Sequence, residues 1–384
     1  MDQFGKGTFG YDVRFLRERD DALVILQDDG GDAQAAVSAK YQGKVFTSTA
    51  QGLGGKSFGW VNYRAFDRIT SGAHINATGG ENRFWIGPEG GQFSIFFKRG
   101  VNMVYDNWFT PAAFDTEPWI PTHAGKTSVR LCKDMLLHNR SGTQLSVRGD
   151  RQVTLLDNGQ IRQKLGIDAV KTAKVAFETR NVITNTGATV WEKATGTVCI
   201  WILDMFTCGN GVTVIAPYRK ADGRQAGKAA TTDYFGEIPP QWLQMTEKAV
   251  FLKADGKKRA KIGLSPLRAL PVAGSYDREN GVLTVVQYDV HPEAEYVNQQ
   301  WKEQEHPYEG DAVNAYNDGP LADGSQMGPF YEIESSSPAA FLSPGASLEH
   351  KHTVFHFAGD ETELDEIAQK VFHLSTNDIK RQFA

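Results

Sequence analysis

Two glutamates stand two residues apart in the stretch "YEIES" (331–335), a spacing that could do chemistry. Alternate residues of a β-strand point to the same face, so Glu332 and Glu334 are expected side by side. Two carboxylates that share a cleft repel each other, which raises the pKa of one and makes it a candidate general acid. The alternative is a solvated strand face with paired surface glutamates. The apolar and Pro-Gly pattern that follows (335–345) favours a strand entering a buried region.

Three further stretches, 74–97, 107–125 and 296–320, bring aromatic and polar residues together in expected loops. A pyranose ring stacks its apolar face on Trp or Tyr, and its hydroxyls need planar polar partners such as Asn, Asp, Glu and Arg. The segment 79–97 holds five glycines, which let a backbone bend around such a ligand. These stretches predict a sugar site with this segment as a rim loop. A tight turn whose Trp85 plugs the end of a sandwich is the alternative.

The histidines His350, His352 and His356 share strand parity and could hold a metal ion. Phe355 and Phe357 mark the opposite face as core, so we expect the histidines on an outer face. Three cysteines without metal-type spacing add no second candidate. We therefore predict no metal site and no cofactor, and a structural or catalytic divalent ion stays open as an alternative.

The formal charge of −5 argues against nucleic acid or an anionic membrane as the main partner. No stretch approaches the ~20 apolar residues that a membrane span requires. The start, "MDQFGKGTFGYDV", shows no signal peptide and resembles the beginning of a mature domain. We read the basic cluster 253–263 as a solvated hairpin tip, because its Asp-Gly pair separates two strand-like runs.

The elements that must position these residues are mostly strands. Apolar runs with a period of two predict strands within 21–28, 92–98, 196–206, 281–290 and 350–359. Asn-Gly pairs at 158–159, 210–211 and 280–281 indicate hairpins. Long helical patterns are missing except at 360–374, where a short helix is expected to cap the sheet. Residues 1–384 are therefore predicted to form one all-β, antiparallel sandwich domain.

The strand with Glu332 and Glu334, followed by Pro338 and "LSPGASLEHKHTVFHF" (342–357), resembles the galactose mutarotase-like (aldose 1-epimerase-like) superfamily. The loop "GGENRFWIGPEGG" (79–91) resembles the N-terminal Gly-Gly…Gly-Pro loop of the same superfamily. The resemblance spans essentially the whole chain and suggests an uncharacterised bacterial branch. It implies an antiparallel β-supersandwich with a concave sugar-binding cleft and a short C-terminal helix.

In mutarotases a glutamate acts as the base and a histidine as the acid. Glu334 is the best match to that base and Glu332 the competitor. No histidine lies between His138 and His291, and the matching region offers Trp201, Asp204 and Arg219 instead. Ordinary mutarotase chemistry is therefore not expected. The resemblance also implies a periplasmic or cell-surface protein, and a cytoplasmic one is the alternative.

The sequence thus predicts a carbohydrate-active protein whose partner is a mono- or oligosaccharide. An enzyme with carboxylate acid/base chemistry, hydrolase-like or epimerase-like, is favoured; a non-catalytic sugar-binding protein is the alternative. Hydrolysis would pair two carboxyl groups roughly 5–10 Å apart, and an arginine could bind a uronate or an anomeric oxygen. The candidate catalytic residues are Glu334, Glu332, Glu89 and Asp318, and the candidate substrate-binding residues are His74, Asn76, Asn82, Arg83, Trp85, Trp108, His123, Trp201, Arg219, Tyr316 and Asn317.

Overall fold

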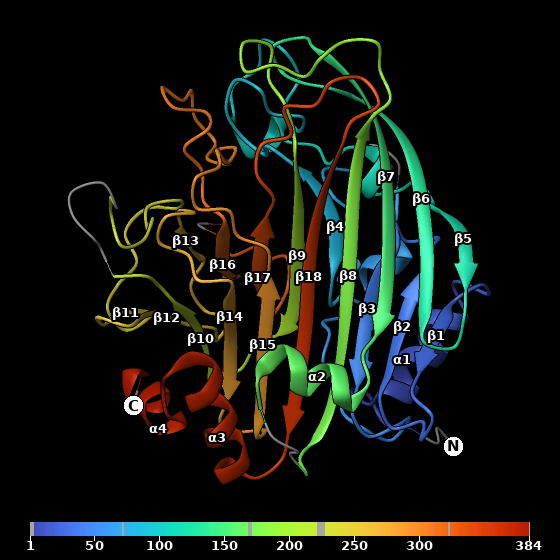
Figure 1. Cartoon of the computed structure of the whole chain (residues 1–384), viewed down its shortest axis with the longest axis vertical. Coiled ribbons are helices and arrows are strands. Elements are labelled where there is room, and N and C mark those ends of the chain that lie inside the picture. The colour runs from blue at the N-terminus through green and yellow to red at the C-terminus, as the bar shows by residue number, and fades with distance from the viewer. Residues whose placement is uncertain (1–3, 71–72, 168–170, 221–226, 322, 384) are drawn as a thin grey trace.

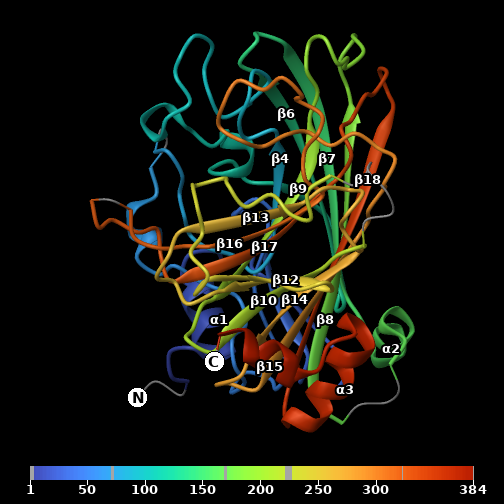
Figure 2. The same cartoon turned by 90° about the vertical axis from the view of Figure 1, so that its left-hand side faces the viewer.

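A computed structural model describes residues 4–70, 73–167, 171–220, 227–321 and 323–383 of the chain. Within these ranges the strands form three sheets, and every pair of neighbouring strands in them is antiparallel. The two larger sheets pack face to face (Figures 1 and 2). Their facing side chains interdigitate in one continuous apolar core, which includes Ile202, Ile333 and Val354.

The largest sheet has ten strands. In spatial order they are β11 (Leu243–Met245), β12 (Ala249–Lys253), β10 (Val212–Pro217), β14 (Val272–Asp277), β15 (Val282–Tyr288), β18 (Ser347–Ala358), β8 (Ala173–Asn185), β7 (Gln144–Leu155), β6 (Ser128–His138) and β5 (Ile120–Ala124). The long strands at its centre run vertically in Figure 1, on the side of the molecule that faces the viewer.

The second sheet has five strands, in the order β13 (Ala260–Leu264), β16 (Val313–Asn317), β17 (Phe330–Ser336), β9 (Cys199–Thr207) and β4 (Arg83–Gly87). A third sheet contains β1 (Val24–Gln27), β2 (Gln34–Ser38) and β3 (Lys44–Thr49). It meets the second sheet through a bridge between Val45 and Asn82. Strands far apart in sequence therefore become neighbours in the second sheet.

Helices are few and short. They are α1 (Phe9–Arg17), α2 (Asn158–Leu165), α3 (Glu361–Phe372) and α4 (Thr376–Lys380), with 3₁₀ turns η1 (Ala65–Arg68), η2 (Tyr105–Asn107), η3 (Ala112–Phe114) and η5 (Arg381–Phe383). Helix α3 packs Leu364 and Ile367 against Phe355 and Phe357 on the outer face of the ten-stranded sheet. Among the described helices, none combines the length and apolar character needed to cross a bilayer.

Two of the three Asn-Gly pairs do not form hairpins. Asn280-Gly281 joins β14 to β15 as expected. Asn158 instead starts helix α2, because Asp157 caps the helix by accepting a hydrogen bond from the Gln160 amide. Asn210-Gly211 connects β9 to β10, which belong to different sheets. Turn-forming dipeptides mark a change of direction, and whether the next strand pairs with the previous one depends on the tertiary fold.

The strand expected at 92–98 is absent from this described segment, which is irregular except for a bridge between Phe97 and Trp108. Ser94 is the local cause. Its hydroxyl donates to the Glu89 carbonyl and accepts a hydrogen bond from the Phe96 amide. The apolar run therefore bends back on itself and fills the core as a loop.

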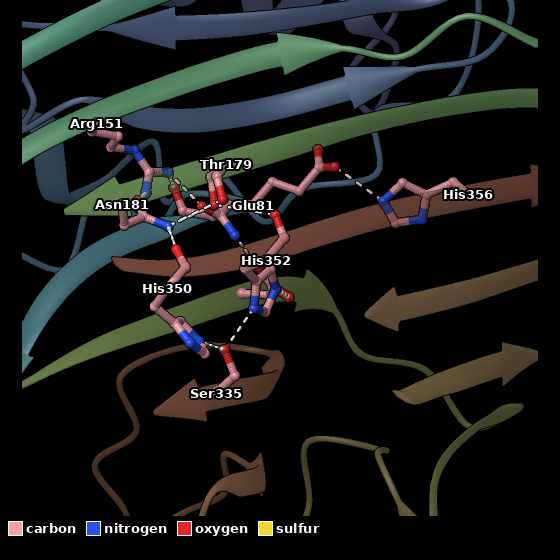
Figure 3. Close-up of polar contacts among 10 residues, drawn as sticks. Glu81, Arg151, Thr179, Asn181, Ser335, His350, His352 and His356 are labelled. Atoms are coloured by element: carbon pink, nitrogen blue, oxygen red, sulfur yellow. Dashed lines mark hydrogen bonds and ion pairs between the residues drawn. The ribbon is translucent and has the colours of Figure 1, made fainter. Parts of the chain in front are cut away.

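The expectation of histidines on an outer face is wrong. His350, His352 and His356 all point into the space between the two large sheets and are fully buried. Ser335 Oγ lies 2.8 Å from both His350 Nε2 and His352 Nδ1, and Glu81 Oε1 lies 3.0 Å from His356 Nε2 (Figure 3). Both faces of β18 are buried, because α3 covers the face that carries Phe355 and Phe357.

Arg151 of β7 is buried in the same polar layer. Its guanidinium donates to Asn181 Oδ1 at 2.7 Å (Figure 3), to the Gly43 carbonyl at 2.9 Å and to Asn82. Asn82 in turn donates to Asp204 Oδ1 at 2.6 Å, and Asp204 Oδ2 lies 2.8 Å from His352 Nε2. Burial lowers the pKa of Arg151 to about 9. Asp204 thus supplies negative charge to a layer that also holds Arg151 and the histidines.

Candidate functional site

The face of the five-stranded sheet that points away from the ten-stranded sheet forms the floor of a pocket. Strand alternation decides which residues face it. Tyr331 and Ser335 of β17 contact Ser275 and the histidines of the ten-stranded sheet, so Glu332 and Glu334 point to the opposite side. The pocket encloses about 610 Å³ of empty space, part of it open to solvent.

Every strand of this sheet contributes to the floor or to its charged edge. The register places Tyr316 opposite Glu332 and Lys261 opposite Tyr316. Loops complete the walls, largely with aromatic and apolar side chains. The residues that line the pocket are Ile75, Arg83, Trp85, Glu89, Tyr105, Trp108, Trp201, Leu203, Met205, Phe235, Arg259, Lys261, Trp301, Tyr316, Met327, Phe330, Glu332 and Glu334.

Two buried ion pairs cross the floor. Lys261 Nζ lies 2.8 Å from Glu334 Oε2, and the Trp201 indole nitrogen donates to the same oxygen at 2.9 Å. Arg83 forms the second ion pair, with Glu332. All four charged side chains are at most a tenth exposed. Removing either partner would leave an unpaired charge in a place that is largely shielded from water.

The protonation of the pocket acids is set mainly by burial. Burial raises the pKa of Glu332; Arg83 opposes this rise and Glu334 adds to it. Burial also raises the pKa of Glu89, against the influence of Lys261. For Lys261 burial acts to lower the pKa, but Glu334 and Glu89 outweigh it and the net pKa is raised. The pocket therefore holds a cation, Lys261, together with two acids, Glu332 and Glu89, whose pKa values are raised by burial.

Three polar atoms of the pocket-lining residues have no hydrogen-bond partner in the described chain: Glu334 Oε1, Arg83 Nε and Trp108 Nε1. Buried polar groups almost always form hydrogen bonds, so each of these atoms lacks a hydrogen bond that a ligand could supply. The set includes one acceptor and two donors. All three are shielded from solvent, so a ligand would reach them only as lining side chains shift. A molecule that carries several hydroxyl groups could satisfy both kinds of atom.

Gly90 explains how two distant loops come to form one wall. A Cβ atom built on Gly90 would lie 2.2 Å from the Gln300 carbonyl oxygen, so only glycine permits this approach. The contact sets Glu89 beside Trp301, and both side chains line the pocket. The Gly-rich stretch 79–97 is thus partly strand β4 and partly a loop fitted closely against residues 299–304.

The structure brings eight of the predicted site residues together. Seven of them come from the four stretches that combine polar and aromatic residues, and Trp201 comes from strand β9. These eight are Glu332, Glu334, Glu89, Arg83, Trp85, Trp108, Trp201 and Tyr316. Trp85 is part of strand β4 and not of a rim loop, and its ring packs among Phe96, Phe114 and Trp201. The catalytic and binding roles of the eight stay predictions.

Three predicted residues lie just behind the pocket wall. Asp318 accepts a hydrogen bond from the Tyr316 hydroxyl at 2.6 Å and is not among the residues that line the pocket. His74 Nδ1 lies 2.6 Å from the Trp108 carbonyl, and its ring stacks on Phe109. Asn76 donates to Asp115 at 2.7 Å. Asp318 and His74 thus contact Tyr316 and Trp108, which line the pocket.

The other four predicted residues lie outside the pocket. His123 is exposed on the edge strand β5, and Arg219 donates to the carbonyls of Pro266 and Ala269. Asn317 is held by the backbone at Gly256 and Lys258. Asn82, the fourth, belongs to the polar layer between the sheets. Asn82 and Asn317 each neighbour a pocket residue, so strand alternation turns them the other way.

The interpretation of the basic cluster as a solvated hairpin tip is wrong in its most important part. Asp255-Gly256 connects β12 to β13, which lie in different sheets. Arg259 and Lys261 therefore enter the pocket, and Lys261 is 6% exposed. The alternation Arg259-Ala260-Lys261 was a usable signal for two side chains on one face. Trp301, Tyr105 and Phe235 were also missed as lining residues.

Comparison with known proteins identifies the family and the fold. Residues 7–383 match DUF6786, a family of unknown function. The chain belongs to DUF6786. No curated protein matches the sequence.

Solved structures similar to this DUF6786 chain include a proposed aldose 1-epimerase from Escherichia coli K12, with a TM-score of 0.50 and 12% identity over 88% of this chain and 99% of that one. The Slr1438 protein from Synechocystis sp. PCC 6803 has a TM-score of 0.51 and 12% identity over 88% and 96%. A galactose mutarotase-like protein from Lactobacillus casei ATCC 334 has a TM-score of 0.48 and 10% identity over 87% and 100%. The predicted all-β, antiparallel, galactose mutarotase-like fold with a short C-terminal helix is confirmed.

The described lining of the pocket in this DUF6786 chain contains no histidine. The groups there that can transfer a proton are the carboxylates, Lys261 and the phenols of Tyr105 and Tyr316. Among the residues that the structure describes, no group of three or more His, Cys, Asp or Glu is arranged to hold a metal ion. The titratable side chains of the pocket can take part in acid/base chemistry beside fixed cations.

Asp311 is a buried acid close to floor strand β13, and it gives a testable pH dependence. Tyr234 donates to Asp311 Oδ2 at 2.7 Å and Thr231 to Oδ1 at 3.3 Å. Burial nevertheless raises the pKa of Asp311 to about 6 from the ordinary value of 3.8 for an aspartate. Between these pH values the folded protein keeps a proton that the unfolded chain has released. The contribution of Asp311 to stability therefore falls as the pH rises through this window.

Asp311→Asn is expected to remove this fall, which amounts to about 3 kcal/mol in the free energy of unfolding. Urea denaturation of both proteins at pH 4, 5, 6 and 7 measures the difference between the two profiles. Asp106→Asn, at an exposed aspartate, is the matched control and should follow the wild type. Parallel profiles for wild type and Asp311→Asn would contradict the assignment.

Proposed function

We propose that this protein binds a mono- or oligosaccharide in the pocket on the five-stranded sheet and acts on it as an enzyme with carboxylate acid/base chemistry. The observation that carries the proposal is the set of three unpartnered polar atoms, Glu334 Oε1, Arg83 Nε and Trp108 Nε1, among aromatic walls. Sugar hydroxyls both donate and accept hydrogen bonds, and sugar C–H faces stack on aromatic rings. A polyhydroxylated ligand can thus supply both the donors and the acceptors that the unpartnered atoms lack.

The two floor glutamates suit different roles. Lys261 and Trp201 hold one oxygen of Glu334, so its other oxygen is the candidate base for a sugar hydroxyl. Burial favours the protonated form of Glu332, which makes this residue the candidate acid toward a ring or glycosidic oxygen. Arg83, paired with Glu332, would stabilise negative charge that develops on oxygen. In an epimerase-like reaction both would act on one anomeric centre; in a hydrolase-like reaction they would flank the scissile bond.

The similar solved structures support a sugar as the ligand. They do not support the transfer of a reaction mechanism to this chain. The Escherichia coli relative is a proposed aldose 1-epimerase. At 12% identity the likeness concerns the fold, which hosts more than one activity. The residues available on this chain are acids, a lysine and arginines, so we assign the reaction to these.

A non-catalytic sugar-binding protein is the second candidate. The observation that favours it is the pairing of both floor glutamates with cations, because an ion-paired carboxylate is a weaker base than a free one. In that case the glutamates would only accept hydrogen bonds from sugar hydroxyls.

Two measurements test the proposal. Ligand-observed proton NMR with a panel of neutral and acidic mono- and disaccharides reports binding. The same spectra report accelerated anomerisation of α-glucose or α-galactose, and release of nitrophenol from aryl glycosides reports hydrolysis. We expect binding and turnover of at least one sugar. Binding without turnover would favour the second candidate, and absence of binding across the panel would contradict both.

A further inference from the structure

Arg259 differs from the other two cations of the pocket. Arg83 and Lys261 are each paired with a glutamate of the floor. Arg259 is half-buried at the entry to strand β13, and its side chain also lines the pocket. Its terminal guanidinium nitrogens make no hydrogen bond or ion pair with any part of the chain that the structure describes. A guanidinium fork is therefore directed to the pocket region without a protein acceptor.

The fork is held in place although its ends are free. The guanidinium carbon lies 3.8 Å from the ring centre of Phe235, which is a stacking distance. Arg259 Nε donates to the Tyr316 hydroxyl at 3.3 Å, and Tyr316 itself is fixed by its hydrogen bond to Asp318. Such a pre-ordered arginine loses little conformational freedom when it binds an anion.

We propose that the substrate of this pocket is a sugar acid, and that Arg259 binds its carboxylate. The inference rests on the proposed function, because it names the substrate class of the same site. The planar fork of a guanidinium matches a carboxylate through two parallel hydrogen bonds. A carboxylate on Arg259 would leave the hydroxyl groups of the same sugar available to the glutamates and to Trp108.

The charges around Arg259 favour a carboxylate over a phosphate ester. Glu89 lines the same pocket and interacts electrostatically with Arg259, and Glu332 and Glu334 lie on the floor beyond Tyr316. A phosphate ester carries a charge of about −1.5 to −2 at pH 7 and a carboxylate carries −1. Because the two floor glutamates are each paired with a cation, Glu89 is the acid that repels an anionic ligand, and the smaller negative charge meets less repulsion.

The test compares ligands that differ in one group. Isothermal titration calorimetry would measure D-glucuronate and D-galacturonate against D-glucose and D-galactose, with glucose 6-phosphate and glucose 6-sulfate as the other anionic ligands. Charge-assisted hydrogen bonds contribute about 1.5–3 kcal/mol. We therefore expect the uronate to bind at least about tenfold more tightly than the matching neutral sugar.

Arg259→Gln should abolish this preference, so that the uronate binds no more tightly than the matching neutral sugar. Arg259→Lys keeps the charge but not the fork, so it should retain only part of the preference. Lys257→Gln removes an exposed cation of the same turn, bonded to Asn210 outside the pocket, and should bind like wild type. Matching thermal melts for the variants would show that each one folds.

The outcomes separate this inference from the proposed function. If no sugar of either kind binds, the proposed function fails. If neutral sugars bind but uronates gain nothing, or Arg259→Gln keeps the preference, only the sugar-acid assignment is overturned. Tighter binding of glucose 6-phosphate or glucose 6-sulfate than of glucuronate would overturn the carboxylate assignment in favour of an ester.

Discussion

Glu334→Gln is expected to lower turnover of the accepted sugar roughly 10²–10⁴-fold, the usual contribution of a positioned acid or base. Glutamine keeps the shape of the side chain and can still accept the hydrogen bond from Trp201, but it cannot take up a proton. The substitution also leaves Lys261 buried without its nearest counter-charge, and we expect the free energy of unfolding to fall by about 3–5 kcal/mol.

The double variant Glu334→Gln with Lys261→Met separates catalysis from folding. It removes both charges of the pair, so most of the lost stability should return while turnover stays low. Glu247→Gln, at a glutamate that is 88% exposed, is the matched control and should change neither quantity. Steady-state kinetics and urea denaturation measure the two effects. Turnover within threefold of wild type in Glu334→Gln would remove this residue from the reaction.

The second large effect is expected at Asp204, in the polar layer between the sheets. Asp204 is fully buried and contacts His352 and Asn82, and Asn82 binds Arg151. Asn has a shape similar to that of Asp, so Asp204→Asn mainly removes the negative charge that offsets Arg151 in this layer. We expect the free energy of unfolding to fall by about 3–5 kcal/mol.

Asp134→Asn is the contrast for this prediction. Asp134 is 74% exposed and forms a surface ion pair with Arg148, so its loss should cost less than about 1 kcal/mol. Guanidinium denaturation at pH 7 compares the two variants. Equal effects at the buried and the exposed aspartate would mean that the charge of Asp204 does not stabilise the layer.

The strand at 330–336 could be predicted because its information is local. Glu332 and Glu334 alternate with Tyr331, Ile333 and Ser335, and a period of two places the glutamates on one face wherever the strand lies in the fold. The aromatic loops were likewise recognisable from composition. These loops come together in one pocket through contacts between distant segments, such as the contact of Gly90 with Gln300. No local sequence pattern encodes such contacts.

The errors have a common physical origin. The stretch with Asn82 was interpreted as a loop, so the alternation that sends Asn82 and Arg83 to opposite faces was not applied to it. The same is true of Asn317 and Tyr316, which are neighbours in one strand and point to opposite faces of the sheet. Lys261 was missed because a turn between two strand-like runs suggests a hairpin, whereas here the next strand joins another sheet. Which sheet a strand enters is decided by the whole fold.

The order of strands in the pocket floor bears on how the protein is made. Strand β4 pairs with β9, more than 100 residues later, and β9 pairs with β17, more than 100 residues later again. A nascent chain that leaves the ribosome must therefore keep β4 without its partner until residue 207 has emerged, and β9 without its second partner until residue 336 has emerged. Such long loops slow folding and expose unpaired strand edges to neighbouring chains. Yield in cells should accordingly depend on chaperone supply and growth temperature.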